Sequence, residues 1–181
     1  MTHRITVSIP DDTLAPALDR PDVERVDWAM QDAAPRDDID IVVPPYLGAS
    51  KRWGFLEGVG PRLVQIQSIG YDGVAEALPA GIVLANAASV HETATSELTL
   101  ALILAAQRDL AGFVRAQETE EWTQHSTRSL ADSRVLLIGY GGVGKAIEER
   151  LLPFETTVTR MASSARSDER GAIHGLSLIH I

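Results

Sequence analysis

RVLLIGYGGVGK, residues 134–145, runs from an apolar strand pattern through a glycine-rich turn into a helical pattern. Gly139, Gly141 and Gly144 fit the spacing G-x-G-x-x-G. In that motif the first glycine allows a sharp turn off the strand, the second removes a side chain that would block a pyrophosphate, and the third lets the helix lie close to the sheet. A phosphate would then bind at the N-terminus of the helix, where backbone N–H groups lack partners and the helix dipole favours an anion.

The residues around this motif decide between a nucleotide site and an ordinary tight turn. Val143, Ile147 and Leu151 recur on one face of a helix, and a second strand pattern follows at 157–161. Strand, turn, helix and strand therefore follow one another at the spacing of a βαβ unit. The pattern favours the first unit of a dinucleotide-binding fold, and the tight turn is kept as the alternative.

The composition is that of a globular chain. The 181 residues are 45% hydrophobic, which leaves room for a core in one or two domains, and no apolar run approaches the ~18 residues of a membrane span. The net charge of −9 argues against nonspecific binding to nucleic acid, and the absence of cysteine excludes disulfides, thiolate metal ligands and a cysteine nucleophile. The N-terminus leads directly into a strand pattern instead of a signal peptide. We therefore expect a cytoplasmic protein with no membrane, nucleic-acid or metal-binding role.

The N-terminal half alternates short strand patterns with short helical ones. We expect strands at 5–9, 23–28, 39–43, 63–68 and 82–85, and helices near 14–18, 50–57 and 74–78. Residues 69–73 then form a loop at the carboxyl end of a strand, where open α/β sheets bind their ligands. The backbone amides of this loop are candidate anion donors, and a plain connecting turn is the alternative.

The longest helical pattern spans residues 91–110. Glu92 and Glu97 near its start and Arg108 near its end carry the charges that the helix dipole favours. Residues 98–106 have almost no polar face, so we expect this part to be buried all round, against another domain or a second subunit. A new strand–turn–helix–strand unit follows. The chain therefore predicts two α/β domains, the second with only two strands of its parallel sheet.

Four blocks of sequence follow one another in a specific order. They are LVQIQSIGYD at 63–72, GIVLAN at 81–86, TSELTLALIL at 95–104, and the glycine motif with LLPF at 151–154 behind it. Together they resemble the D-isomer-specific 2-hydroxyacid dehydrogenases, NAD(P)-dependent oxidoreductases that include phosphoglycerate dehydrogenases and glyoxylate/hydroxypyruvate reductases. The resemblance implies a flavodoxin-like substrate domain at 1–93, the first βαβ of an incomplete Rossmann domain that binds NAD(P) at 94–176, and a homodimer. Residues 177–181 do not continue the family pattern, so we expect a non-native tail on a C-terminally truncated chain.

The resemblance also implies roles for individual positions. The amides of Ile69 and Gly70 would hold the substrate carboxylate. Gly142 and Val143, the variable pair of the glycine motif, would lie against the cofactor pyrophosphate. Family members often have threonine where Ala87 stands, so the cofactor contact of that threonine is in doubt here.

The end of the second strand bears on the choice between NAD and NADP. Members of the family that prefer NAD carry an aspartate at the position of Ala162, and here Ser163 and Arg166 follow that position instead. With a hydroxyl and a guanidinium and no carboxylate to repel a 2′-phosphate, NADP is slightly favoured over NAD. A solvated surface charge is the alternative for Arg166.

The catalytic arginine, glutamate and histidine of the family all fall beyond Ile181, so no catalytic residue is assigned within the chain. The resemblance implies an enzyme that reduces a small 2-keto acid, such as glyoxylate, hydroxypyruvate or a phosphoglycerate-type substrate, or oxidises the D-2-hydroxy acid. We expect the chain as written to be inactive. Two alternatives stay open: an NAD(P)-sensing, corepressor-like binding protein on the same scaffold, and a short α/β domain that binds no nucleotide.

Overall fold

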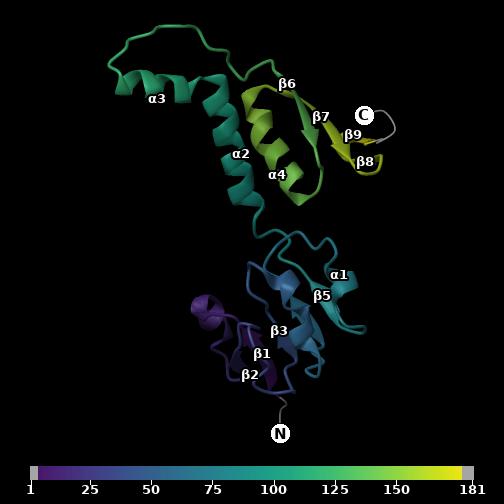
Figure 1. Ribbon diagram of the computed structural model, residues 1–181. Coiled ribbons are helices and arrows are strands. Elements are labelled where there is room, and N and C mark those ends of the chain that lie inside the picture. The colour runs from purple at the N-terminus through teal and green to yellow at the C-terminus, as the bar shows by residue number, and fades with distance from the viewer. Residues whose placement is uncertain (1–3, 177–181) are drawn as a thin grey trace. The chain divides into compact units, whose positions relative to one another are not determined.

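The computed structural model describes residues 4–176. The chain divides into two compact units, Met1–Val90 and His91–Ile181, and each is described by itself (Figure 1). The tail expected at 177–181 lies outside the described residues. Within the described part of the chain, no helix combines the length and the apolar character needed to cross a membrane.

The first unit is built on a parallel sheet of five short strands. The strands are β1 (Ile5–Ile9), β2 (Val23–Asp27), β3 (Ile41–Val42), β4 (Leu63–Gln65) and β5 (Val83–Ala85), and the helices are η1 (Asp12–Leu18), η2 (Ala49–Lys51), η3 (Trp53–Leu56) and α1 (Val74–Ala77), where η denotes a 3₁₀-helix. The strand order is β2-β1-β3-β4-β5, and every neighbouring pair is parallel. This is the strand order of flavodoxin-like folds, so the expected fold class is confirmed.

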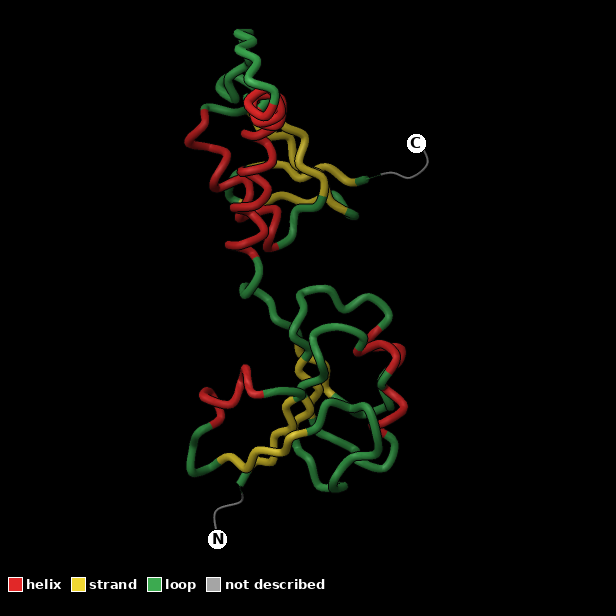
Figure 2. Tube along the Cα trace, turned by 60° about the vertical axis from the view of Figure 1, so that its left-hand side comes forward, coloured by secondary structure: helices red, strands yellow, loops and turns green. Residues whose placement is uncertain are grey.

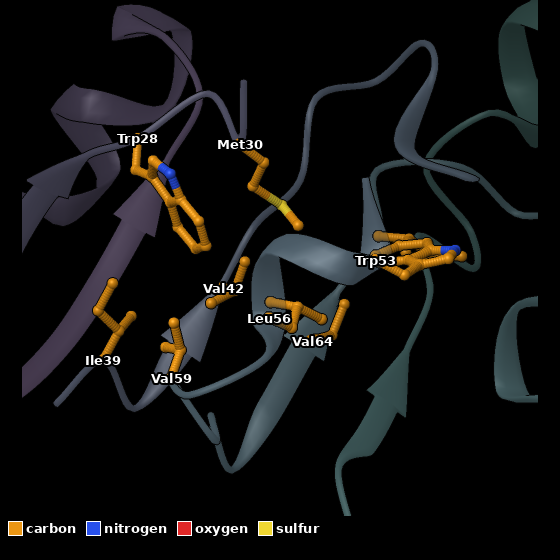
Figure 3. Close-up of a cluster of buried hydrophobic side chains, with 9 residues drawn as sticks. Trp28, Met30, Ile39, Val42, Trp53, Leu56, Val59 and Val64 are labelled. Carbon is orange, nitrogen blue, oxygen red and sulfur yellow. The ribbon is translucent and has the colours of Figure 1, made fainter. Parts of the chain in front are cut away.

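Apolar side chains cover both faces of this sheet. On one face Val42 and Val64 pack with Leu56 of η3 in a buried cluster of nine residues (Figure 3). On the other face Ile9 and Val43 pack against side chains of η1. Successive residues of a strand point to opposite faces, so burial on both sides explains why the central strand patterns are apolar almost throughout.

Three local predictions for the first unit are wrong in detail. The strand expected at 63–68 ends at Gln65, where β4 ends. The helix expected near 50–57 forms the two 3₁₀-helices η2 and η3, because Arg52 leaves the helical conformation between them (φ −120°) and donates a hydrogen bond to the carbonyl of Ala29 (2.6 Å). The strand expected at 39–43 is shortened to β3. Its ladder is nevertheless extended at one end, where the N–H of Val43 donates to the carbonyl of Ser8 (3.0 Å).

The second unit carries α2 and α4 on one face of a four-stranded sheet (Figure 2). Its elements are α2 (Glu92–Gln107), α3 (Leu110–Glu118), β6 (Arg134–Ile138), α4 (Gly142–Leu151), η4 (Leu152–Phe154), β7 (Thr157–Ala162), β8 (Arg166–Asp168) and β9 (Gly171–Gly175). The strand order is β6-β7-β9-β8, in which β6, β7 and β9 are parallel and β8 is antiparallel to β9.

The expectation of only two strands in this unit is therefore wrong. β9 supplies a third parallel strand, so β9-β7-β6 has the 3-2-1 order of a Rossmann half. The chain reaches β9 through the short strand β8 instead of a crossover helix. Residues 163–172 are mostly small or charged, so they lack the apolar alternation that marks a strand in sequence.

Within this chain the helix α2 is buried on one side only, so its expected burial against a second subunit stays a prediction. Leu100 packs with Ile147 and Leu151 of α4 in the core, whereas Leu98 and Leu102 are 60% and 62% exposed. Packing against α4 covers one side of α2 and leaves the row through Leu98 and Leu102 open within this chain.

The strand β6 is covered on one face only. Val135 and Leu137 point to the helices and join their core, while Leu136 and Ile138, which alternate with them, are 57% and 62% exposed. The two-residue period of a strand places Leu136 and Ile138 on the face opposite α2 and α4.

The core of the first unit can be tested with a matched pair of leucines. Leu56→Ala should lower the free energy of unfolding by about 2–5 kcal/mol, because it leaves a cavity where a 1% exposed side chain packs. Leu47→Ala, at a position 77% exposed, should change it by less than about 0.5 kcal/mol. Urea unfolding followed by the fluorescence of Trp28 and Trp53, which belong to the same cluster, measures the difference. Equal losses in the two variants would contradict this core.

Candidate functional site

The glycine loop, residues 139–144, runs from the end of β6 into the first turn of α4, and each motif glycine has its own structural reason. Gly139 has φ +96°, a left-handed conformation that favours glycine, and its N–H donates to the carbonyl of Met161 (2.8 Å). A Cβ on Gly144 would clash with the carbonyl of Gly139, so glycine lets α4 approach the end of β6 closely. A Cβ on Gly141 would meet nothing within 4 Å, so the space at that position is open.

The N-terminus of α4 offers backbone donors to an anion. Its first hydrogen bond runs from the N–H of Lys145 to the carbonyl of Gly141 (3.0 Å), and no side chain caps the helix at Gly141. Among the described residues, no hydrogen bond uses the N–H of Gly142 or Val143. These donors and the positive end of the helix dipole form the kind of site that binds a phosphate.

Glu92, the first residue of α2, lies beside this turn. A Cβ on Gly142 would come within 2.5 Å of a carboxylate oxygen of Glu92, so the end of this flexible side chain lies next to Gly142. The carboxylate of Glu92 is close to the positive ends of both helices, where a negative charge is favourable.

The end of β7 runs alongside the glycine loop, because Ile138 of β6 is in register with Met161 of β7. Ser163 is exposed there. The guanidinium of Arg166 donates from Nη2 to the carbonyl of Tyr140 (2.6 Å), the residue between the first two motif glycines. The structure therefore brings Arg166 to the glycine loop.

A charged cluster lies behind the glycine loop, and sequence reasoning missed it. Glu148 of α4 is 1% exposed, and its carboxylate accepts hydrogen bonds from the hydroxyl of Tyr140, from Arg160 of β7 (2.6 Å) and from Arg170 (3.1 Å). The guanidinium of Arg160 also lies 5.4 Å from the centre of the Tyr140 ring. The signal in the sequence was a glutamate next to Ile147 on the side of the helix predicted to be apolar.

The cluster perturbs two pKa values. Burial raises the pKa of the Glu148 carboxyl, but the hydrogen bonds from Tyr140, Arg160 and Arg170 outweigh burial, so this pKa lies below its ordinary value. Burial and then the hydrogen bond to Glu148 raise the pKa of the Tyr140 hydroxyl. The carboxylate and the neutral phenol are therefore the stable forms at neutral pH.

In the first unit, Ile69 and Gly70 lie in the loop between β4 and α1. Asn86 donates from Nδ2 to the carbonyl of Ile69 (2.8 Å), and the hydroxyl of Ser68 donates to the carbonyl of Gly70 (2.9 Å). No hydrogen bond between described residues uses the N–H of either residue. Tyr71 and Asn86 help to line a cavity of about 400 Å³ next to this loop. The loop therefore has free donors of the kind that a carboxylate needs.

Residues 100–178 match the family model of the D-isomer specific 2-hydroxyacid dehydrogenase, NAD binding domain. Among curated proteins, the glyoxylate reductase/hydroxypyruvate reductase of Mus musculus is 27% identical over 165 residues, which cover 83% of this chain and 50% of that protein. Residues 100–178 are therefore similar to the NAD-binding domain of these dehydrogenases. The chain spans about half the length of the curated relative that it matches.

Solved structures of proteins in this dehydrogenase family share the fold. A D-isomer specific 2-hydroxyacid dehydrogenase family protein from Aeromonas salmonicida has a TM-score of 0.74 at 18% identity, over 92% of this chain and 56% of that chain. The NADPH-dependent glyoxylate/hydroxypyruvate reductase of Sinorhizobium meliloti, solved with NADP and sulfate, has a TM-score of 0.72 at 22% identity, over 97% and 57%.

The glycine positions of the second unit should differ in their effect on stability. Gly144→Ala should lower the free energy of unfolding by about 2–3 kcal/mol, because the added methyl group clashes with the carbonyl of Gly139. Gly141→Ala should cost less than about 1 kcal/mol, because its methyl group enters open space. Thermal and urea unfolding measure both values. A Gly144→Ala variant as stable as Gly141→Ala would show that the two segments are not in close contact.

The stabilisation that Glu148 provides should depend on pH. Its folded-state pKa is depressed, so the stabilisation is complete above the ordinary glutamate pKa of about 4.3 and is lost as the pH falls from there through the folded-state pKa. Glu148→Gln should therefore be less stable than wild type at neutral pH and should approach it in acid. Melting temperatures across a pH series measure this convergence. Glu149→Gln, which changes an exposed neighbour, is the control and should follow the wild-type curve.

Proposed function

We propose that this chain belongs to an NAD(P)-dependent oxidoreductase that transfers hydride between the cofactor and a small D-2-hydroxy acid or its 2-keto acid. The observation that carries the proposal is the glycine loop. There the N–H groups of Gly142 and Val143 lie next to the open space at Gly141, at the N-terminus of α4. This donor set fits a pyrophosphate, in a domain whose family model is described as NAD-binding.

NADP is the cofactor that the end of β7 fits better. Ala162 supplies no carboxylate, while the Ser163 hydroxyl and the Arg166 guanidinium follow it beside the loop. The S. meliloti reductase was solved with NADP, and a related dehydrogenase from Xanthobacter autotrophicus, 21% identical, was solved with NADPH. A bound nicotinamide supplies the hydride, and the residues of this chain bind and orient the phosphate groups.

The substrate carboxylate would bind to the N–H groups of Ile69 and Gly70. Their carbonyls are held by Asn86 and Ser68, which fixes the loop in a conformation that leaves the amides available. The mouse relative is named for glyoxylate and hydroxypyruvate. We therefore infer a small 2-keto acid of that kind, or a phosphoglycerate-type substrate.

The proton-transfer chemistry is assigned to no residue of this chain. The family resemblance places the catalytic arginine, glutamate and histidine beyond Ile181, so we expect the 181-residue chain to bind cofactor without turning over glyoxylate or hydroxypyruvate. The enzyme is proposed to be a cytoplasmic homodimer. The exposed row through Leu98 and Leu102 on α2 supports a partner surface.

Cofactor titration tests the proposal. NADPH fluorescence should saturate on addition of the wild-type chain, and Gly141→Ala should weaken NADPH binding at least about tenfold, because its methyl group fills the space for the pyrophosphate. Gly54→Ala, at an equally open position in the first unit, is the control and should bind like wild type. If the wild-type chain binds neither NADPH nor NADH, the oxidoreductase assignment is wrong.

A further inference from the structure

The β8–β9 hairpin, residues 166–175, connects the candidate cofactor site to the buried cluster. Its first residue, Arg166, contacts the glycine loop, and its turn contacts Glu148 through Arg170. We propose that Glu148 is a positioning residue that sets the place of Arg166 beside the loop and thereby the preference for a nucleotide with a 2′-phosphate. This inference rests on the proposed function, in which Arg166 would contact the 2′-phosphate. It adds the residues that hold Arg166 in place.

Arg166 has few contacts of its own. It is exposed, and its strand β8 lies at the edge of the sheet, where it pairs with β9. Its guanidinium donates to the carbonyl of Tyr140 (2.6 Å) and, at 3.4 Å, to the carbonyl of Ser164. Fixing a long side chain costs rotamer entropy, so the backbone that carries Arg166 must be held in place for the side chain to keep one orientation.

The turn of the hairpin provides that hold. Arg160 of β7 is 12% exposed, and it donates to the carboxylate of Asp168 (3.2 Å) and to the carbonyl of Arg170 (2.9 Å). Arg170 donates to Glu148 (3.1 Å) and to Glu149 (3.2 Å) of α4. Because Arg160 also donates to Glu148 (2.6 Å), both arginines that bind the turn share one buried carboxylate.

Tyr140 completes the connection from Glu148 to Arg166. Its hydroxyl donates to the Glu148 carboxylate, and its carbonyl accepts from Arg166. Tyr140 is 2% exposed and belongs to the glycine loop. A displacement of Glu148 would therefore reach Arg166 by two routes, through the loop and through the hairpin.

The cost of burying Glu148 supports a role beyond packing. A buried charge loses its hydration, and apolar side chains of similar size often give equal or greater stability. If Glu148 only anchored α4, its loss would weaken every ligand of the glycine loop alike. A residue that positions Arg166 must instead act on the contact with a 2′-phosphate selectively.

Two adenosine ligands that differ only in the 2′-phosphate provide the test: adenosine 2′,5′-bisphosphate and adenosine 5′-monophosphate. Calorimetric titration of the full 181-residue chain gives both dissociation constants. Glu148→Gln keeps the shape of the side chain but removes the charge that both arginines share. We expect it to weaken the bisphosphate about tenfold and the monophosphate less than about twofold. Arg166→Ala should have the same selective effect. Combining it with Glu148→Gln should lower the ratio of the bisphosphate affinity to the monophosphate affinity no further.

Glu149→Gln is the matched control, because it removes a 57% exposed partner of the same Arg170 and should leave the ratio of the two affinities unchanged. If circular dichroism shows that Glu148→Gln does not fold, Arg170→Gln replaces it, with the same expected fall in the ratio. It removes the direct bond between Glu148 and the turn, and it leaves the bonds of Glu148 to Tyr140 and Arg160.

Three results would overturn the inference while the proposed function stands. The first is a wild-type chain that binds the bisphosphate no more tightly than the monophosphate, and the second is a Glu148→Gln variant in which the affinities for both ligands fall equally. The third is an Arg166→Ala variant that loses the preference for the bisphosphate while Glu148→Gln or Arg170→Gln keeps it. Failure of wild type to bind either adenosine ligand or NADPH would instead overturn the proposed function.

Discussion

The close backbone contact between Gly144 and Gly139 is the constraint on which the second unit depends. Without a Cβ at Gly144, the first turn of α4 lies against the carbonyl at the end of β6. The same placement directs Ile147 and Leu151 into the core and the first N–H groups of the helix toward the loop. Packing and anion binding are therefore two results of one helix position, and neither can change without the other.

The buried cluster extends this coupling to the strands beyond the loop. Glu148 follows Gly144 by about one helical turn, so the contact that fixes the helix also fixes the carboxylate under Tyr140. Each of its arginine partners comes from a different part of the sheet. Removing one member of such a group leaves an uncompensated buried charge, which costs more than the intact pair contributes. Loop, helix and hairpin are consequently joined by hydrogen bonds that meet at Glu148.

The sequence predicted the elements whose signals are local. Apolar alternation located the strand at 5–9, an apolar run located the strand at 134–138, and glycine spacing located the loop between β6 and α4. What it missed depends on partners far along the chain: β9 is a strand because it pairs with β7, and Glu148 is buried because Arg160 and Arg170 neutralise it. The burial expected for α2 is present on the side that faces α4, whereas the row through Leu98 and Leu102 depends on a partner that the sequence pattern does not identify.

The free edge of β6 has a consequence for the behaviour of the chain in solution. Among the described strands β6 pairs with β7 alone, so the backbone groups along its other edge have no sheet partner, and Leu136 and Ile138 make one of its faces apolar. An edge of this kind is a template onto which strands of other molecules can add. Mutual repulsion from a net charge of −9 opposes such growth, so salt, by screening that repulsion, would favour fibrous self-assembly over dispersed single chains.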